Sequence, residues 1–254
     1  MKGVLFDLDG VFYVEQQLIA GGIDCLRWLN ERQIPYRFVT NNTTMCRKDL
    51  TAKLRRLGLE VDEQEIMSAN YAGVLLLDQR GFKRCRLVLR PAAQQDYPTN
   101  CLQNPDAIVI GDIGNRWDYD LLNELMNQVL EGAEIIALHK GRYHQGASGL
   151  LLDSGAFVAA LEHATGKQAL VVGKPNQTFF KLASNTFSCN PNELLMVGDD
   201  LINDIGGANQ MGMHTVLVQT GKYRKVLVEA SSIQPHGCIP SIKELPAYLE
   251  NIVL

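Results

Sequence analysis

The segment Val4-Leu5-Phe6-Asp7-Leu8-Asp9-Gly10 begins with apolar residues and ends with two carboxylates and a glycine. A short apolar run predicts a buried β-strand, and Gly10 permits a tight turn directly after it. In an open parallel sheet, ligands bind at the carboxyl ends of the strands. Asp7 and Asp9 therefore lie where such a sheet would place a site, and their mutual repulsion calls for a positively charged partner.

Further apolar segments of strand length follow along the chain, and helical patterns lie between most of them. This alternation predicts parallel strands joined by helical crossovers. The predicted strands are residues 4–6, 36–39, 86–89, 107–110, 134–137, 170–172, 194–197 and 215–218. The predicted helices are residues 23–31, 48–57, 69–79, 119–130, 156–163, 178–187 and 202–210. We expect an α/β protein whose core is a Rossmann-like, doubly wound parallel sheet.

The chain of 254 residues is long enough for a core domain that carries a smaller one. No linker-like stretch separates two halves, so a second domain has to be an insertion that returns to the first sheet. All chemically informative residues fall outside residues 82–165. We therefore expect a catalytic core made of residues 1–81 and 166–254, with residues 82–165 as an inserted, smaller α/β domain.

The composition is that of an ordinary folded protein, with 46% hydrophobic and 20% charged residues. A net charge of −4 gives no electrostatic reason to expect binding to nucleic acid or to an anionic membrane. The six cysteines include no CxxC pair, which gives no sign of a zinc site or a disulfide framework. No run of 18 apolar residues and no signal-peptide pattern occurs, so we expect a soluble, cytoplasmic protein.

Two further motifs also stand at predicted strand ends. Thr40 and Asn41 follow an apolar strand and offer a hydroxyl and backbone N–H groups suited to phosphate oxygens. Lys174 stands between a buried strand and a helix start, where a fixed positive charge can hold an anionic substrate beside a carboxylate. Each motif taken alone is also compatible with an ordinary turn or an exposed lysine.

The fourth motif, Gly198-Asp199-Asp200-Leu201-Ile202-Asn203-Asp204, places more acids at another strand end. Asp199 and Asp204 can face one point if the first ends the strand and the second lies on the following helical turn. Together with Asp7 and Asp9 they would form a cluster too repulsive to persist without a divalent cation. All of its ligands are oxygens, and this favours Mg²⁺ over zinc or copper.

The order of these four motifs resembles the haloacid dehalogenase superfamily of phosphatases, and the resemblance spans nearly the whole chain. It implies that Asp7 is the nucleophile that forms an aspartyl phosphate and that Asp9 is the general acid and base. It also implies that Thr40 and Asn41 bind the transferring phosphoryl group. Lys174 would take part in both binding and catalysis, because it would clamp that group to the nucleophile.

The same resemblance implies a magnesium site. Mg²⁺ would be held by Asp7, by Asp199 and by the backbone carbonyl of Asp9, and Asp204 would support it. The physical reason is that a carboxylate and a phosphate repel each other, so their approach needs nearby positive charge. We therefore expect a magnesium-dependent hydrolase that acts on a small phosphorylated molecule: a phosphate monoester, a phosphoramidate or a pyrophosphate.

The long spacing between Thr40 and Lys174 is similar to the 4-nitrophenylphosphatase-like branch of this superfamily, whose α/β cap is inserted between these motifs. Such a cap excludes water and selects the substrate, and in this branch it often supplies a homodimer contact. The segments Gly141-Arg142-Tyr143-His144 and Ser148-Gly149-Leu150 resemble the eukaryotic-type members, among them phospholysine phosphohistidine inorganic pyrophosphate phosphatase. Arg142 and His144 are candidate substrate contacts, although a solvated polar turn is the commoner explanation for either residue.

Other functions compete with this one. A carbon–halogen hydrolase of the same superfamily would not need the full acidic site. A phosphate-accepting signalling receiver uses similar residues but places its acidic pair before the accepting aspartate, and it is a much shorter protein. A phosphate-binding protein that has lost catalysis would have no use for Asp9. A phosphomutase shares the core motifs but is disfavoured by the cap type.

Overall fold

The computed structural model describes residues 1–98, 100–146 and 149–253, which form two compact units. The first unit comprises Met1–Thr40, Thr51–Met67 and Lys174–Leu254, and the second comprises Asn41–Leu50 and Ser68–Gly173. The expected insert, residues 82–165, lies within the second unit, whose limits are wider. That this insert acts as a cap remains a prediction. Ser148, part of the second eukaryotic-type segment, lies outside the described residues.

The first unit contains a six-stranded sheet whose neighbouring strands run parallel wherever their register is defined. Its strands, in their order across the sheet, are β14 (Gly237–Ile239), β13 (His214–Val218), β12 (Leu194–Gly198), β1 (Gly3–Phe6), β4 (Tyr36–Thr40) and β5 (Ile66–Ser68). The central strands are buried along their whole length, as parallel strands covered on both faces should be. A short hairpin, β2 (Tyr13–Val14) and β3 (Gln17–Leu18), follows β1.

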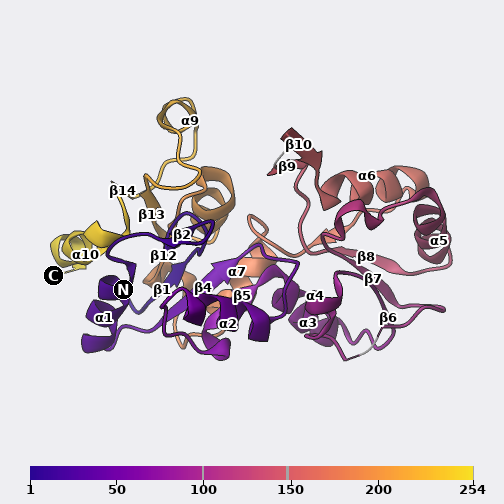
Figure 1. Cartoon of the computed structure of the whole chain (residues 1–254), viewed down its shortest axis with the longest axis horizontal. Coiled ribbons are helices and arrows are strands. Elements are labelled where there is room, and N and C mark those ends of the chain that lie inside the picture. Colours follow the sequence, from indigo (N-terminus) through magenta and orange to yellow (C-terminus); the bar gives the residue numbers. More distant parts are fainter. Residues whose placement is uncertain (99, 147–148, 254) are drawn as a thin grey trace. The chain divides into compact units, whose positions relative to one another are not determined.

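Helices and single helical turns lie between these strands in the chain and follow the last of them (Figure 1). The helices are α1 (Gly22–Glu31), α2 (Arg47–Arg56), α7 (Gln177–Ser184), α8 (Gly207–Asn209), α9 (Lys225–Glu229) and α10 (Leu245–Val253). The 3₁₀ turns are Glu63–Glu65, Pro191–Glu193 and Ile242–Glu244. The segment Leu201–Gly206 forms a π-helical turn where the sequence predicts an ordinary α-helix.

The register of the sheet explains how distant motifs meet. Phe6, the last residue of β1, pairs with Val197 on one side and with Phe38 on the other. The residues that follow these three positions therefore emerge at the same edge of the sheet. Phe12 packs edge to face against Phe6 and Phe38, with ring centroids 5.2 and 5.4 Å apart, and so anchors the turn that follows β1.

The second unit contains a parallel sheet of four strands and a separate hairpin. The sheet strands, in order, are β11 (Leu170–Val171), β8 (Glu134–Ala137), β7 (Ala107–Ile110) and β6 (Cys85–Val88), and the hairpin strands are β9 (Tyr143–Gly146) and β10 (Gly149–Leu152). Its helices are α3 (Ala69–Arg80), α4 (Pro91–Gln94), α5 (Tyr119–Leu130) and α6 (Ser154–Thr165), with a 3₁₀ turn at Gly114–Arg116.

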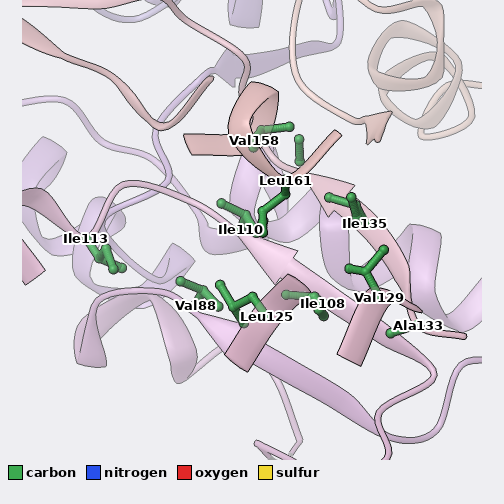
Figure 2. Packing of buried hydrophobic residues seen from close by; sticks show 11 residues of the cluster. Val88, Ile108, Ile110, Ile113, Leu125, Val129, Ala133, Ile135, Val158 and Leu161 are labelled. Atoms are coloured by element: carbon green, nitrogen blue, oxygen red, sulfur yellow. The ribbon is translucent and has the colours of Figure 1, made fainter. Parts of the chain in front are cut away.

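This unit has its own hydrophobic core, in which α5 and α6 pack on one face of the four-stranded sheet (Figure 2). Leu125 and Val129 of α5 and Val158 of α6 are fully buried against Ile108 and Ile110 of β7. The expected fold class, a Rossmann-like parallel sheet with a separate inserted α/β sheet, is confirmed. In the part of the chain that the structure describes, no helix combines the length and hydrophobicity needed to cross a membrane.

Candidate active site

Lys174 connects two of the predicted acidic residues. Its Nζ donates hydrogen bonds to Oδ1 of Asp7 at 2.8 Å and to Oδ1 of Asp204 at 2.7 Å, and to the carbonyl of Val39 at 3.3 Å. All three side chains are buried, at 3%, 9% and 0% exposure. Burial alone would lower the pKa of Lys174, but the charges of Asp204 and Asp7 outweigh it and raise that pKa. The ammonium is therefore charged, and two carboxylates share it.

Asp199 follows β12 and is 2% exposed. Its Oδ2 accepts a 2.7 Å hydrogen bond from the backbone N–H of Lys222 and lies against the backbone of Gly10. A Cβ atom at Gly10 would lie 1.9 Å from this oxygen, and the φ of Gly10 is +78°, so both packing and backbone require glycine there. Burial, reinforced by the charge of Asp7, raises the pKa of the Asp199 carboxyl to about 7.

Asp204 is held by the π-helical turn that follows β12. Its Oδ2 accepts a hydrogen bond from the backbone N–H of Asp200 at 3.1 Å. The Asp200 side chain caps the turn, because its Oδ1 accepts from the N–H groups of Ile202 and Asn203 at 3.1 and 2.9 Å. Such turns occur frequently at functional sites. Here the turn directs a fully buried carboxylate toward Lys174.

One carboxylate oxygen each of Asp7, Asp199 and Asp204 lies within 4.8 Å of the other two. Burial, reinforced by Asp7, raises the pKa of Asp204 well above its ordinary value despite the charge of Lys174. Oδ1 of Asp199 is buried and has no hydrogen-bond partner among the described residues. A lone buried acceptor beside two further carboxylates is the donor set of a hard divalent cation. These residues therefore fit a metal ion.

Asp9 is placed differently from this group. Its side chain is exposed and does not belong to the cluster of three buried carboxylates. Tyr13 donates to its Oδ2 at 3.3 Å, and Lys53 in turn donates to the Tyr13 hydroxyl at 3.4 Å. Partial desolvation raises the pKa of the Asp9 carboxyl, with Asp7 adding to the effect and Lys53 opposing it. Its predicted contribution to the metal, through its backbone carbonyl, stays a prediction.

The two residues predicted to bind phosphate belong to different units. Thr40 ends β4 in the first unit and is 7% exposed. Asn41 belongs to the second unit, where its Nδ2 lies 3.3 Å from Nδ1 of His139. The structure therefore brings Asp7, Lys174 and the acids after β12 together, while the phosphate-binding role of Thr40 and Asn41 stays a prediction.

Several contacts that shape this site were not predicted from the sequence. Lys222 holds Asp199 through its N–H and Asp200 through its Nζ at 3.0 Å, and Thr220 donates its hydroxyl to the carbonyl of Gly10. These contacts come from the loop after β13. The signal that could have found them is the segment Thr220-Gly221-Lys222, which follows a predicted strand and so belongs at the same edge of the sheet.

Two family models match the chain, one on each side of its middle. The haloacid dehalogenase-like hydrolase model matches residues 4–98, and the HAD-hydrolase-like model matches residues 171–245. Haloacid dehalogenase-like hydrolase domain-containing protein 2 of Rattus norvegicus is 39% identical over 236 residues, which are 93% of this chain and 91% of that protein. The chain belongs to the haloacid dehalogenase-like hydrolases.

Two other relatives of this haloacid dehalogenase-like hydrolase agree with the subclass predicted from the motifs. Phospholysine phosphohistidine inorganic pyrophosphate phosphatase of Bos taurus is 35% identical over 250 residues, which are 96% of this chain and 92% of that protein. The crystal structure of 4-nitrophenylphosphatase from Thermotoga maritima matches with a TM-score of 0.89 at 26% identity, over 97% of each chain. The family and its 4-nitrophenylphosphatase-like subclass are confirmed.

Proposed function

We propose that the protein is a magnesium-dependent phosphatase that hydrolyses a small phosphorylated substrate through an aspartyl phosphate on Asp7. The single observation that carries the proposal is the buried arrangement in which one ammonium, that of Lys174, lies between Asp7 and Asp204. A buried carboxylate next to a fixed positive charge is suited to approach a phosphate, because part of the repulsion between the two anions is cancelled in advance.

In the first half-reaction, a carboxylate oxygen of Asp7 attacks the phosphorus atom. The bond between phosphorus and the leaving oxygen or nitrogen breaks, and the leaving atom takes a proton from Asp9. The pKa of Asp9 is raised by partial burial, which is the direction of shift that a general acid requires. In the second half-reaction, Asp9 accepts a proton from water, and this water attacks phosphorus and releases phosphate and the Asp7 carboxylate.

Lys174 and the segment after β4 bind the phosphoryl group in this proposal. Thr40 offers a hydroxyl, and Asn41 offers a backbone N–H to the phosphoryl oxygens. The Lys174 ammonium is fixed by two carboxylates, so it supplies charge to the phosphoryl group without moving.

Mg²⁺ would be held by the carboxylates of Asp7, Asp199 and Asp204 and by the backbone carbonyl of Asp9. When bound, the ion would neutralise the phosphoryl oxygens and the attacking carboxylate. The unpartnered Oδ1 of Asp199 and the raised pKa values of Asp199 and Asp204 support a site that lacks one further positive charge. The same acidic cluster favours a phosphatase over a carbon–halogen hydrolase, which would not need it.

The substrate class rests on the relatives. One is a 4-nitrophenylphosphatase, and another carries phospholysine, phosphohistidine and pyrophosphate in its name. We infer a phosphate monoester, a phosphoramidate or a pyrophosphate as the substrate, with residues 82–165 acting as the cap that selects it. We also propose a cytoplasmic location.

A homodimer through the cap is a further part of the proposal. The hairpin of β9 and β10 carries Leu150, Leu151 and Leu152, which are 64%, 47% and 66% exposed. Three consecutive exposed leucines place apolar side chains on both faces of a two-stranded ribbon. A second copy of the chain would cover them. Light scattering of a Leu150→Glu/Leu152→Glu variant would show monomers where the unaltered protein shows dimers.

The experiment that tests the function is a phosphate-release screen with purified protein and Mg²⁺. The panel includes 4-nitrophenyl phosphate, a phosphoramidate and pyrophosphate, and Asp7→Asn serves as the inactive control. We expect release from at least one class, its abolition in Asp7→Asn and its abolition by chelation of the metal. Absence of release from the whole panel would contradict the proposal.

A further inference from the structure

Within the second unit, three side chains form a continuous chain of polar contacts. Nδ2 of Asn41 lies 3.3 Å from Nδ1 of His139, and Nε2 of His139 lies 3.2 Å from Oδ2 of Asp153. The side chains of His139 and Asp153 are 24% and 14% exposed, so both are largely shielded from water. His139 is the middle member of this chain of contacts. Its neighbours lie 98 residues before it and 14 residues after it.

Asp153 is held rigidly at the start of α6. Its Oδ1 accepts hydrogen bonds from the backbone N–H of Ser154 at 2.6 Å and from the Ser154 hydroxyl at 3.3 Å. A Cβ atom at Gly141 would lie 2.2 Å from Oδ2 of Asp153 and 2.4 Å from Nε2 of His139. The pair therefore lies directly against a residue that has no side chain, and there is no space for it to rearrange in that direction.

The segment that carries His139 is also tied to α6. Lys140 donates to Oε2 of Glu162 at 2.6 Å, and the N–H of Gly155 donates to the carbonyl of Gly141 at 3.1 Å. The Ser154 hydroxyl also lies 3.2 Å from the carbonyl of His139 itself, so its one hydrogen is shared between this carbonyl and Asp153. Both the backbone and the ring of His139 are therefore fixed by the same helix terminus.

Donor and acceptor rules determine which way each group faces. An ionised carboxylate only accepts, so Nε2 of His139 carries the proton in its bond to Asp153. When the ring is neutral, Nδ1 is then an acceptor, and Nδ2 of Asn41 donates to it. This leaves Oδ1 of Asn41 on the side of Gly173, where a Cβ atom would lie 2.8 Å from it. Asp153 thus sets the amide orientation of Asn41 through the tautomer of His139.

We infer that His139 is a positioning residue, which with Asp153 fixes Asn41 and thereby the backbone turn that presents its N–H to the phosphoryl group. The inference rests on the proposed function of Asn41 as a phosphate-binding residue. The inference predicts that Nδ1 of His139 is needed as a hydrogen-bond acceptor. The site needs an acceptor at the position of Nδ1, whereas filling the volume of the ring would not be enough.

Two variants of His139 separate these requirements. In His139→Asn the carboxamide oxygen reaches the position of Nδ1 and can still accept from Asn41, while in His139→Gln the carboxamide reaches the position of Nε2 and can still donate to Asp153. We expect His139→Gln to lose roughly 10- to 100-fold in kcat/KM, mainly through KM, and His139→Asn to recover most of that loss. Melting temperatures of both variants report the structural cost separately.

Asp153→Asn tests the other contact of the His139 ring, the one between Nε2 and Asp153. Asparagine caps helices as well as aspartate does, so α6 keeps its start. To cap the helix, the asparagine oxygen must accept from the N–H of Ser154, so the amide NH₂ turns toward Nε2 of His139. An NH₂ group only donates, so Nε2 has to be the acceptor and Nδ1 becomes the protonated nitrogen. Nδ1–H then meets the NH₂ of Asn41 and forces that amide to flip.

The decisive readout is the tautomer of His139, measured by long-range ¹H–¹⁵N NMR on the full chain with His139→Gln to assign the signals. We expect Nε2–H in the unaltered protein and Nδ1–H in Asp153→Asn, with the order of kcat/KM given above. Nδ1–H in the unaltered protein, no change in Asp153→Asn, or equal losses in His139→Asn and His139→Gln would each overturn the inference. The NMR result does not depend on turnover, so an inactive protein would refute the proposed phosphatase function separately.

Discussion

Nζ of Lys174 lies 2.8 Å from Oδ1 of Asp7, although 167 residues separate them in the chain. The same ammonium lies 2.7 Å from Oδ1 of Asp204, which is fully buried. The buried interior of the first unit therefore contains charged groups, and their desolvation costs folding free energy. Such an arrangement is a candidate for function, because an apolar core would be easier to stabilise.

Removal of this ammonium should strongly destabilise the protein. We expect Lys174→Met to lower the free energy of unfolding by about 3–5 kcal/mol, because it leaves buried carboxylates without their partner. Lys225→Met is the matched control, since the Lys225 side chain is 76% exposed and its ion pair with Glu229 should contribute about 0–1 kcal/mol. Urea unfolding without metal checks both, and similar losses in the two variants would show that the buried pairs are not intact.

Gly10 should not tolerate a side chain. Gly10→Ala places a Cβ atom 1.9 Å from Oδ2 of Asp199, in addition to the strain of a φ of +78°. Gly81→Ala is the control, because its φ is +71° and nothing lies within 4 Å of a Cβ atom there, so it carries only the backbone cost of about 1–2 kcal/mol. We expect Gly10→Ala to be clearly less stable than Gly81→Ala and to lose Mg²⁺ binding. Equal unfolding free energies would argue against this packing.

Asp199→Asn should separate metal binding from folding. The asparagine oxygen can still accept from the N–H of Lys222, which lies 2.7 Å from Oδ2 of Asp199. Loss of a carboxylate whose pKa is raised by burial removes an unfavourable charge, so we expect the metal-free variant to be no less stable than the unaltered protein at pH 8. Calorimetric titration should show that its Mg²⁺ binding is lost. Unchanged Mg²⁺ affinity would remove Asp199 from the metal site.

The effect of Mg²⁺ on stability should depend on pH. The pKa of Asp199 is about 7 in the fold and lower in the unfolded chain, so the folded state binds the extra proton between these values. In the metal-free protein, the contribution of Asp199 to stability is therefore present at low pH and is lost as pH rises through about 7. Since Mg²⁺ competes with this proton, we expect a larger Mg²⁺-induced rise in Tm at pH 8 than at pH 6. A larger rise at pH 6 would have the wrong sign.

Asp9 should act in catalysis with little effect on the fold, because its side chain is exposed. We expect Asp9→Asn to lower kcat about 10²- to 10⁴-fold while the melting temperature stays nearly unchanged. Tyr13→Phe removes the hydroxyl that lies 3.3 Å from Oδ2 of Asp9 but keeps the carboxyl, so we expect a smaller loss. Steady-state kinetics on the best substrate of the screen measures both. A larger loss in Tyr13→Phe than in Asp9→Asn would reverse the assigned roles.

The sequence was sufficient for the main strands of both sheets, because their apolar runs are long enough to stand out. All eight predicted strands are present, including the central β1 and β12. In the six-stranded sheet, the prediction missed β5 and β14, with three residues each, whose pairing depends on neighbours already in place. It also missed the strands of the two hairpins, β2 with β3 and β9 with β10. It also gave an α-helix at residues 202–210, where the capping of Asp200 and the burial of Asp204 produce a π-helical turn first.

Most of the acidic cluster was predictable, because strand ends in a parallel sheet converge and bring Asp7, Asp199 and Asp204 together. The side chain of Asp9, predicted in the same cluster, lies outside it and is exposed. The contacts of Lys222 and of His139 were not predictable in the same way. They depend on individual polar contacts, which Lys222 makes with Asp199 and Asp200. His139 makes its contacts with Asn41 and Asp153. Hydrophobic periodicity carries no information about such contacts.

The most direct test of the central claim is detection of a phosphoryl group on Asp7. Asp9→Asn protein is mixed with Mg²⁺ and 4-nitrophenyl phosphate, quenched in acid and digested for mass spectrometry. We predict a phosphoryl adduct on the peptide that contains Asp7, its removal by hydroxylamine, and its absence in the Asp7→Asn/Asp9→Asn double variant. Turnover by the unaltered protein with no adduct in Asp9→Asn, or with the adduct on another residue, would contradict the account.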